Sequence, residues 1–137
     1  MSDYIKPIPT SSEDSEPYWQ AARNHEFTLQ KCRDCAAFRF PPAAVCAECT
    51  SGAYDWTPVS GKGKVFSFVI FHRAYHPGFK GELPYVVGCI ELDEGPRMLS
   101  NVIGCKPEDV RCDMPVDVVF EDITDEVSLP KFRPARA

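Results

Sequence analysis

Four cysteines between residues 32 and 49 are the side chains of this sequence best suited to chemistry. They form two Cys-x-x-Cys pairs, Cys32 with Cys35 and Cys46 with Cys49, and ten residues separate the pairs. Each pair can form a tight turn that points both thiolates at one spot, and the segment between them is long enough to run out and back. Four thiolates fill the tetrahedral shell of Zn²⁺ and leave no position open for a substrate. The spacing therefore predicts a structural zinc ribbon with these four cysteines as ligands.

Other uses of paired cysteines fit this stretch less well. Disulfides need an oxidising compartment, and the first residues contain no apolar run typical of an export signal, so we expect a cytoplasmic location. A redox Cys-x-x-Cys normally occurs once, at the start of a helix, whereas here it is doubled and interrupted by a Pro-rich loop. Iron in a rubredoxin-like site uses the same four sulfurs, and the sequence leaves zinc and iron both open.

The residues after each pair depart from the usual pattern of such turns. The backbone there often needs a positive φ, which favours glycine. This sequence has Ala36 and Thr50 at the two positions. The departure weakens the ideal turn geometry but leaves the predicted ligand set unchanged.

The other cysteines and the histidines do not form a catalytic pattern. Three cysteines have no histidine near them in sequence that would activate a thiolate, and we interpret them as small buried residues. His72 and His76 have only Glu82 nearby as a third ligand for a second metal, so surface hydrogen bonding is the simpler interpretation. The sequence has no Gly-rich phosphate motif and no Ser elbow. We therefore expect no catalytic residues; the three cysteines are Cys89, Cys105 and Cys112.

Length and charge limit the classes of protein to consider. The chain has 137 residues, 44% of them hydrophobic and 26% charged, which suits one soluble domain or two small ones sharing a core. The net charge of −5 argues against a general nucleic-acid binder. No stretch is long and apolar enough to cross a membrane, so we expect no membrane partner. The middle of the chain, 61–100, is its least acidic part.

The N-terminal third contains one predicted helix. Residues 1–12 are rich in Pro, Ser and Thr and predict an extended or mobile arm. Ser15 is typical of a helix cap, and the helix is expected over 16–24. Tyr18 and Trp19 are its large side chains, and the sequence leaves open whether they pack on this protein or dock on a partner. We expect the arm and helix to occupy 1–24, the ribbon 25–57 and the last domain 58–137.

Beyond the ribbon the sequence is rich in β-formers. Within the ribbon, 27–31 alternates like a strand, and Tyr54 and Trp56 are expected to cover the metal site. Five further strands are expected, with a turn at 93–96 and one helical turn at 107–110. Five strands in so few residues favour a small closed barrel, the OB-fold, over an open β-sandwich. The five candidates are 64–71, 84–92, 97–103, 116–123 and 129–132. The fold class is thus mainly β, and the long connection 72–82 is expected to be functional.

The order of these features resembles the zinc-ribbon/OB-fold family of small proteins found with acyl-CoA enzymes, long filed as a domain of unknown function. The similarity runs from about Pro17 to Pro134, and each motif is specific only in this order. The motifs are Pro17-Tyr18-Trp19, the four cysteines, Phe40-Pro41-Pro42, Gly61-Lys62-Gly63-Lys64-Val65, Ser67-Phe68, Pro84-Tyr85-Val86, Met114-Pro115-Val116 and Leu129-Pro130-Lys131-Phe132-Arg133-Pro134.

The resemblance implies an accessory subunit rather than an enzyme. Family members resemble partners of thiolase-fold enzymes, including aldolases and acyltransferases, or of hot-dog-fold enoyl-CoA hydratases. A hetero-oligomer acting in steroid, aromatic or fatty acyl-CoA metabolism is therefore expected, with ribbon and helix docked on the enzyme and the barrel enclosing an acyl-CoA. Arg73, Lys80 and Arg97 could contact its phosphates, although plain solubility explains them equally well. The alternative is a single-stranded nucleic-acid-binding module, which the acidic last third of the chain disfavours.

Overall fold

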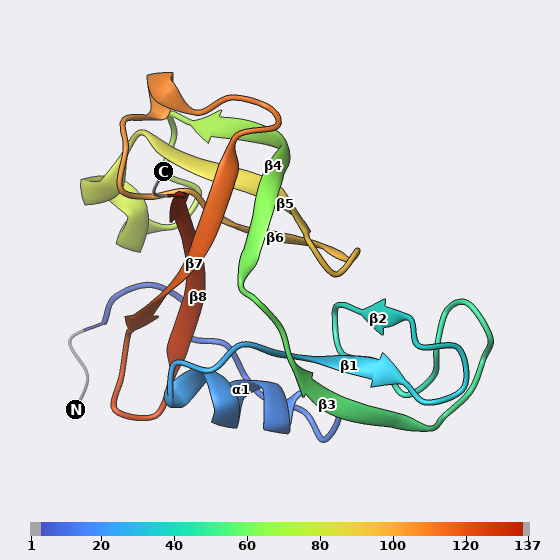
Figure 1. Ribbon diagram of the computed structural model, residues 1–137. Coiled ribbons are helices and arrows are strands. Elements are labelled where there is room, and N and C mark those ends of the chain that lie inside the picture. Colours follow the sequence, from blue (N-terminus) through green and yellow to red (C-terminus); the bar gives the residue numbers. More distant parts are fainter. Residues whose placement is uncertain (1–3, 136–137) are drawn as a thin grey trace.

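The computed structural model describes residues 4–135 and is mainly β, with one short α-helix, a small ribbon and a nearly closed barrel (Figure 1). No helix in this described part is long and apolar enough to span a membrane. The elements are α1 Glu16–Arg23, β1 Thr28–Cys32, β2 Phe38–Arg39, β3 Tyr54–Pro58, β4 Lys62–Phe71, the 3₁₀ helix η1 Pro77–Glu82, β5 Tyr85–Leu92, β6 Arg97–Asn101, the 3₁₀ helix η2 Pro107–Asp109, β7 Pro115–Asp122 and β8 Ser128–Pro134.

Helix α1 occupies the predicted place but is not capped as expected. Ser15 is the N-cap residue, yet its side chain makes no cap hydrogen bond. Its backbone is already helical, and its hydroxyl oxygen instead accepts from the N–H of Ser12 at 2.9 Å. Tyr18 is buried and its ring packs against Phe27 and Phe40. For Tyr18, packing on the protein's own core is therefore confirmed.

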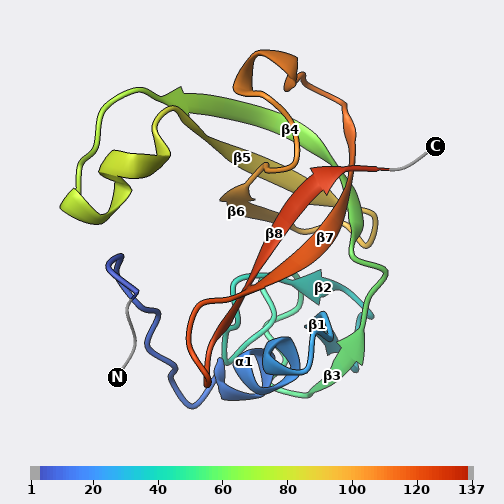
Figure 2. The same cartoon turned by 90° about the vertical axis from the view of Figure 1, so that its left-hand side faces the viewer.

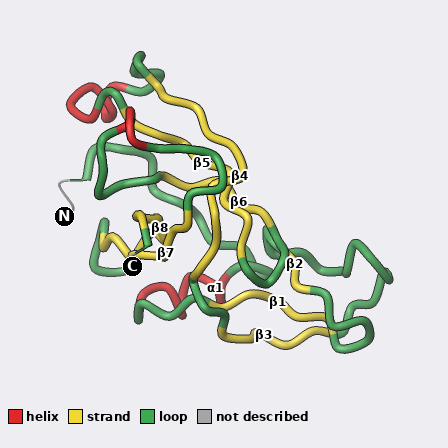
Figure 3. Tube along the Cα trace, turned by 45° about the horizontal axis from the view of Figure 1, so that its top comes forward, coloured by secondary structure: helices red, strands yellow, loops and turns green. Residues whose placement is uncertain are grey.

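The ribbon is a three-stranded antiparallel sheet in the order β2-β1-β3 (Figure 3). Its centre is Gln30, a fully buried polar residue on β1. The side-chain oxygen of Gln30 accepts from Arg39 Nε at 3.0 Å and from the N–H of Ala43 at 2.8 Å, and its Nε2 donates to the Ala43 carbonyl at 3.1 Å. One side chain thus holds the loop between the two cysteine pairs against the sheet.

The second sheet has the order β6-β5-β4-β7-β8 and curls into the predicted five-stranded barrel. A parallel bridge between Val102 and Phe132 brings its two edges together, so the barrel interpretation is confirmed over the β-sandwich. Strand β4 bends at a bulge between Val65 and Ser67, which lets its start pair with β7 while its whole length pairs with β5. The predicted helical turn is η2.

Ribbon, helix and barrel share one hydrophobic core. Phe132 of β8 is fully buried, and the ring of Phe27 lies edge-on to it with centroids 6.4 Å apart. Phe27 also contacts Tyr18 of α1, at 6.3 Å. Aromatic contacts therefore run without a break from the helix to the barrel. The domain boundaries expected from the sequence stay a prediction.

The N-terminal arm lies against the long β4–β5 connection. Figure 2 shows the first described residues running from α1 toward η1. Lys6 Nζ lies 2.8 Å from Glu82 Oε2, and its ammonium is 5.2 Å from the centroid of the Phe79 ring. A Cβ atom on Gly78 would stand 2.6 Å from the carbonyl oxygen of Ile5, so only glycine allows this approach. The described part of the predicted arm is thus extended and fastened to the loop.

Candidate metal centre

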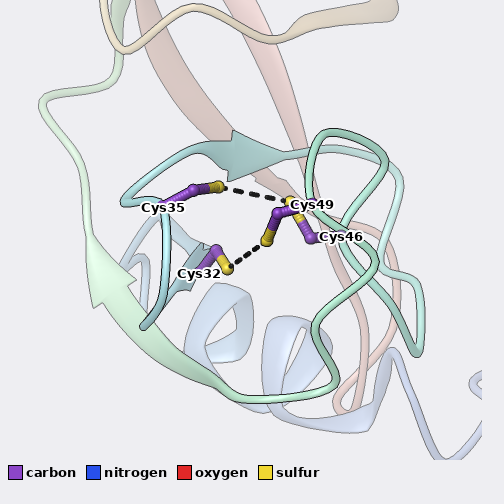
Figure 4. Close-up of side chains that lie close together, drawn as sticks. All are labelled: Cys32, Cys35, Cys46 and Cys49. Carbon is purple, nitrogen blue, oxygen red and sulfur yellow. Dashed lines mark hydrogen bonds between the residues drawn. The ribbon is translucent and has the colours of Figure 1, made fainter.

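Four sulfur atoms converge at one end of the ribbon (Figure 4). All four Sγ atoms lie within 4.8 Å of one another. The Sγ atoms of Cys32 and Cys49 are 3.5 Å apart, and those of Cys35 and Cys46 are 3.6 Å apart. A tetrahedral Zn²⁺ with sulfurs at about 2.3 Å requires sulfur–sulfur distances of roughly 3.8 Å. The cluster therefore fits a single ion with four thiolate ligands.

Two turns of the same construction present these sulfurs. The N–H of Ala36 donates to the carbonyl of Cys32 at 3.0 Å, and the N–H of Thr50 donates to that of Cys46 at 2.9 Å. Ala36 has a φ of 65° and Thr50 a φ of 63°. The left-handed backbone expected at these positions is thus present without glycine, at a cost of roughly 1–2 kcal/mol each. A closed ligand set that needs this geometry explains why the chain tolerates the strain.

Backbone N–H groups aim at the first sulfur of each pair. The N–H of Cys35, followed by that of Asp34, lowers the pKa of the Cys32 thiol to about 6. In the second turn the N–H groups of Cys49 and Glu48 lower the pKa of the Cys46 thiol in the same way. Donors fixed in the turn stabilise the thiolate before any ion arrives. These two sulfurs therefore ionise most readily.

The second sulfur of each pair behaves in the opposite way. The N–H of Ala37 lowers the pKa of Cys35, but the neighbouring Cys46 sulfur and burial outweigh it and raise that pKa. For Cys49 the N–H of Ser51 is likewise outweighed by the other sulfurs, and the pKa rises to about 12. Four thiolates this close repel one another unless a cation lies between them. The cluster thus holds protons or a metal ion, and a dication displaces the protons.

Residues outside the four cysteines brace the two turns. Ser51 Oγ donates to Asp34 Oδ2 at 2.5 Å, which links one turn to the other. Tyr54 lies opposite Cys32 in the β1–β3 register, while Trp56 packs against the hydrophobic core. The guanidinium of Arg39 lies 4.6 Å from the centroid of the Tyr54 ring. Sequence reasoning did not predict the contact between Ser51 and Asp34 or that between Arg39 and Tyr54, because both depend on how the loops fold.

The three basic residues proposed for phosphates do not lie together. Arg73 and Lys80 are both in the connection between β4 and β5, and the guanidinium of Arg73 lies 5.4 Å from the centroid of the Tyr75 ring. Arg97 begins β6, where it stacks at 3.7 Å on the Phe66 ring and pairs with Glu91. The connection leaves from the opposite end of β4 and β5, about seven residues or roughly 23 Å away. One phosphate cannot contact all three.

The histidine loop has a structural role at one position. Nδ1 of His76 accepts from the N–H of Gly78 at 3.0 Å and so begins η1, which confirms the hydrogen-bonding interpretation for this residue. Glu82 pairs with Lys6. Between residues 4 and 135 the four cysteines are the one group of three or more metal-ligating side chains close enough to share an ion.

Two family models match the chain. The model described as "ChsH2, rubredoxin-like zinc ribbon domain" matches residues 19–55, and that described as "ChsH2, C-terminal OB-fold domain" matches residues 56–121. Both models describe features of the structure: the ribbon with its four sulfurs and the five-stranded barrel.

Relatives and a solved structure agree with these models. The chain is 36% identical to a "Probable enoyl-CoA hydratase alpha subunit" of Thermomonospora curvata, covering 96% of this chain but only 40% of that protein. It is 36% identical to a "DUF35 domain-containing scaffold protein" of Methanocaldococcus jannaschii, covering 70% and 68%. The solved structure titled "Ltp2-ChsH2(DUF35) aldolase" contains a chain 35% identical to this one, with a TM-score of 0.85 over 94% of this chain and 100% of that chain.

Proposed function

The chain belongs to the ChsH2/DUF35 family, which joins a rubredoxin-like zinc ribbon to an OB-fold, and from this premise we propose that it is a non-catalytic accessory subunit of an acyl-CoA enzyme. Its ribbon holds one structural Zn²⁺, and its ribbon and α1 dock on a thiolase-fold enzyme or an enoyl-CoA hydratase. Its barrel and the β4–β5 connection contact the acyl-CoA. The complex works in the cytoplasm on a steroid, aromatic or fatty acyl group.

The closed cysteine cluster is the observation that carries this proposal. Four sulfurs within 4.8 Å saturate a tetrahedral ion, so the metal supports the fold and has no site for a substrate. The relatives bear names of hydratase subunits and scaffold proteins, which supports a role as one part of an assembly. Because the chain spans only 40% of the hydratase subunit's length, that protein's activity enters here only as a guide to the kind of partner.

The identity of the ion is tested directly. Zinc is favoured because the matching family model is a zinc ribbon, while iron uses the same four sulfurs. Elemental analysis of the chain purified without added metal should give one zinc per chain. A ferric tetrathiolate site would instead colour the protein, and one equivalent of iron would overturn the zinc assignment.

We place the proposed docking surface on the side of the molecule that contains α1. A groove of about 780 Å³ runs between the arm, α1 and the β7–β8 hairpin, with Trp19 on its wall. Ile8 lines the same groove, and Val45 in the ribbon is more than half exposed. Large apolar side chains that stay exposed on a small domain mark interaction surfaces. These side chains support docking through the helix and ribbon.

The acyl-CoA contacts remain proposed for the basic residues. Arg73 and Lys80 both lie in the connection between β4 and β5 and can contact the same end of a long ligand. Arg97 lies at the other end of the strands and would contact a different part of it, or none. Lys80→Ala and Arg97→Ala in the assembled complex separate these cases, because only the residue that contacts the ligand should raise the KM for acyl-CoA.

Recovery from the native source tests the accessory role. The tagged chain should co-purify with a thiolase-fold enzyme or a hydratase in a fixed ratio, identified by mass spectrometry. A Cys46→Ser variant is the matched control and should lose the partner. Recovery of the wild-type chain alone, with neither enzyme, would count heavily against the proposal.

Binding of single-stranded nucleic acid is the second candidate, and two contacts favour it. Arg97 stacks on Phe66 and Arg73 lies over Tyr75, and both tyrosine and phenylalanine here are exposed. Aromatic and arginine side chains on a barrel surface are the groups that stack with bases. The net charge of −5 opposes it. Filter binding at low salt, where electrostatic binding is strongest, should show no retention of single strands.

A further inference from the structure

Two cavities away from the cysteine cluster meet at the same pair of side chains. The first, of about 320 Å³, lies between the N-terminal arm, η1, the start of β5 and the segment after β6. The second, of about 240 Å³, lies between α1, β6 and β8. Asn101 and Lys131 line both cavities, which places these two side chains where the cavities adjoin.

Lys131 is a buried lysine whose ammonium pairs with one carboxylate. It is 6% exposed and alternates along β8 with the core residue Phe132, so its side chain leaves the strand on the opposite face. Its Nζ lies 2.6 Å from Glu121 Oε2. An ammonium carries three N–H donors, and Glu121 is the one acceptor paired with it among residues 4–135. The remaining donors need acceptors, and the cavities are where an acceptor can enter.

The charges around the first cavity are already balanced. Lys131 is paired with Glu121, and Lys6, which lines the same cavity, is paired with Glu82 at 2.8 Å. A second anion would therefore be desolvated here without a counter-ion of its own, which is unfavourable. Because both ammonium groups already have a carboxylate partner, a neutral acceptor suits this site better than an anion. A neutral carbonyl oxygen supplies the acceptor and adds no charge.

The walls of the cavities suit a hydrocarbon chain. Phe79 and Tyr85 stack with ring centroids 5.0 Å apart on one side, and Trp19 and Met98 line the other cavity. We propose that Lys131 and Asn101 bind a neutral, carbonyl-bearing chain, an amide or a thioester. Its carbonyl oxygen accepts from Lys131 Nζ and its hydrocarbon lies against Trp19 and Met98. This deepens the proposed function, on which it rests for the choice of ligand, because the pantetheine arm and thioester of an acyl-CoA have this chemistry.

A pair of small molecules that differ in one group tests the proposal. Pantothenamide is a neutral diamide, and pantothenate is the same scaffold with a carboxylate in place of the primary amide. Calorimetric titration of the full chain should show the amide binding about tenfold or more tightly than the carboxylate. Lys131→Met should weaken the amide by about tenfold or more, since a hydrogen bond from a charged donor is lost. Lys64 is an exposed residue of β4 that pairs with Asp113. The control variant Lys64→Met should therefore leave the affinity for the amide unchanged.

A second variant keeps the test decisive if Lys131→Met does not fold. Glu121→Gln retains the ammonium but removes its counter-charge, so pantothenate should gain affinity relative to the amide. Equal binding of the two probes by the wild-type chain, no binding of the amide, or unchanged amide affinity in a folded Lys131→Met would each overturn the proposal. None of these results alters co-purification with an enzyme, so failure of this site and failure of the accessory role are distinguishable.

Discussion

Gln30 and Ala43 exchange two hydrogen bonds: the N–H of Ala43 donates to Gln30 Oε1 at 2.8 Å, and Gln30 Nε2 donates to the Ala43 carbonyl at 3.1 Å. The side-chain amide thus pairs with the loop backbone as a neighbouring strand would. The loop it holds runs from the first cysteine pair to the second, so this contact sets where Cys46 enters the cluster. A residue that binds no metal thereby helps to place the metal ligands.

Gln30→Leu should destabilise the protein by about 1–3 kcal/mol, because the half-buried backbone groups of Ala43 and the buried Arg39 Nε lose their partner. Urea unfolding measures the loss. Gln20→Leu is the control: Gln20 is exposed on α1 and its side chain donates to Glu16, an exposed partner, so the effect on stability should stay near zero. Equal stability of the two variants would show that the loop does not depend on Gln30.

Cys46→Ser should release the metal and unfold the ribbon, since metal binding contributes on the order of 10 kcal/mol to folding such a small sheet. Zinc content and circular dichroism report the two effects, and the barrel strands should stay partly formed. Cys112 is exposed, so the burial expected for it from the sequence is wrong; because it lies outside the ribbon, Cys112→Ser should leave metal content unchanged. A Cys46→Ser protein with full zinc and full stability would refute the four-ligand assignment.

Ala36→Gly should stabilise the protein by up to about 1 kcal/mol. The φ of 65° costs alanine roughly 1–2 kcal/mol, and this gain exceeds the entropy that glycine adds to the unfolded chain. Ala47→Gly, in the second turn but outside the positive-φ residues, should instead lower stability. Thermal melts of the zinc-loaded proteins measure the change in melting temperature for each variant. A lower melting temperature for both variants would mean that the turn is unstrained.

Asp122→Asn should alter how stability depends on pH. The Ser128 hydroxyl, and after it His25, lowers the pKa of Asp122 below its usual value. A depressed folded-state pKa gives stability that is present above the unfolded value near 3.9 and is lost as pH falls through the folded value. The free energy of unfolding in urea should therefore be higher for the wild type than for Asp122→Asn at pH 7 and pH 5. This difference should shrink toward pH 3. Asp125→Asn, in the same hairpin, should show no such closing difference.

Gly61→Ala should destabilise by more than about 1 kcal/mol. Gly61 has a φ of 74°, and a Cβ there would stand 2.4 Å from Val118 Cγ1. The matched control is Gly81→Ala, because no atom lies within 4 Å of the Cβ position at Gly81 and its φ is not positive. Chemical unfolding should separate the variants clearly; similar values would mean that β7 moves to make room.

The sequence was informative where the signal is local. Cysteine spacing depends on two short turns, and strand patterns depend on alternation within a few residues, so the ribbon, the barrel strands and α1 were all foreseen. The positive φ after each cysteine pair is kept although Ala36 and Thr50 stand there, so the weakened turn expected from the missing glycines is not observed. These features need no knowledge of what lies across the fold.

Contacts between distant segments were not foreseen. Lys6 and Glu82 are 76 residues apart, and nothing in either stretch indicates the pair. Gln30 is a polar residue on a strand with an amphipathic pattern, so the sequence alone does not indicate its partner. That partner is the backbone of a loop whose path depends on the metal site. Arg97 was grouped with Arg73 by charge alone, and the strand register separates them. Long-range register and loop paths are the information that composition lacks.

The aromatic contacts from Tyr18 through Phe27 to Phe132 have a consequence for how loss of the metal would affect the stability of the fold. Damage at the sulfurs, by chelation or oxidation, would loosen β1, and Phe27 stands immediately before that strand. The disturbance would pass into the barrel through shared rings rather than stop at the ribbon. Loss of the metal ion would then lower the stability of the helix and the barrel together with that of the ribbon.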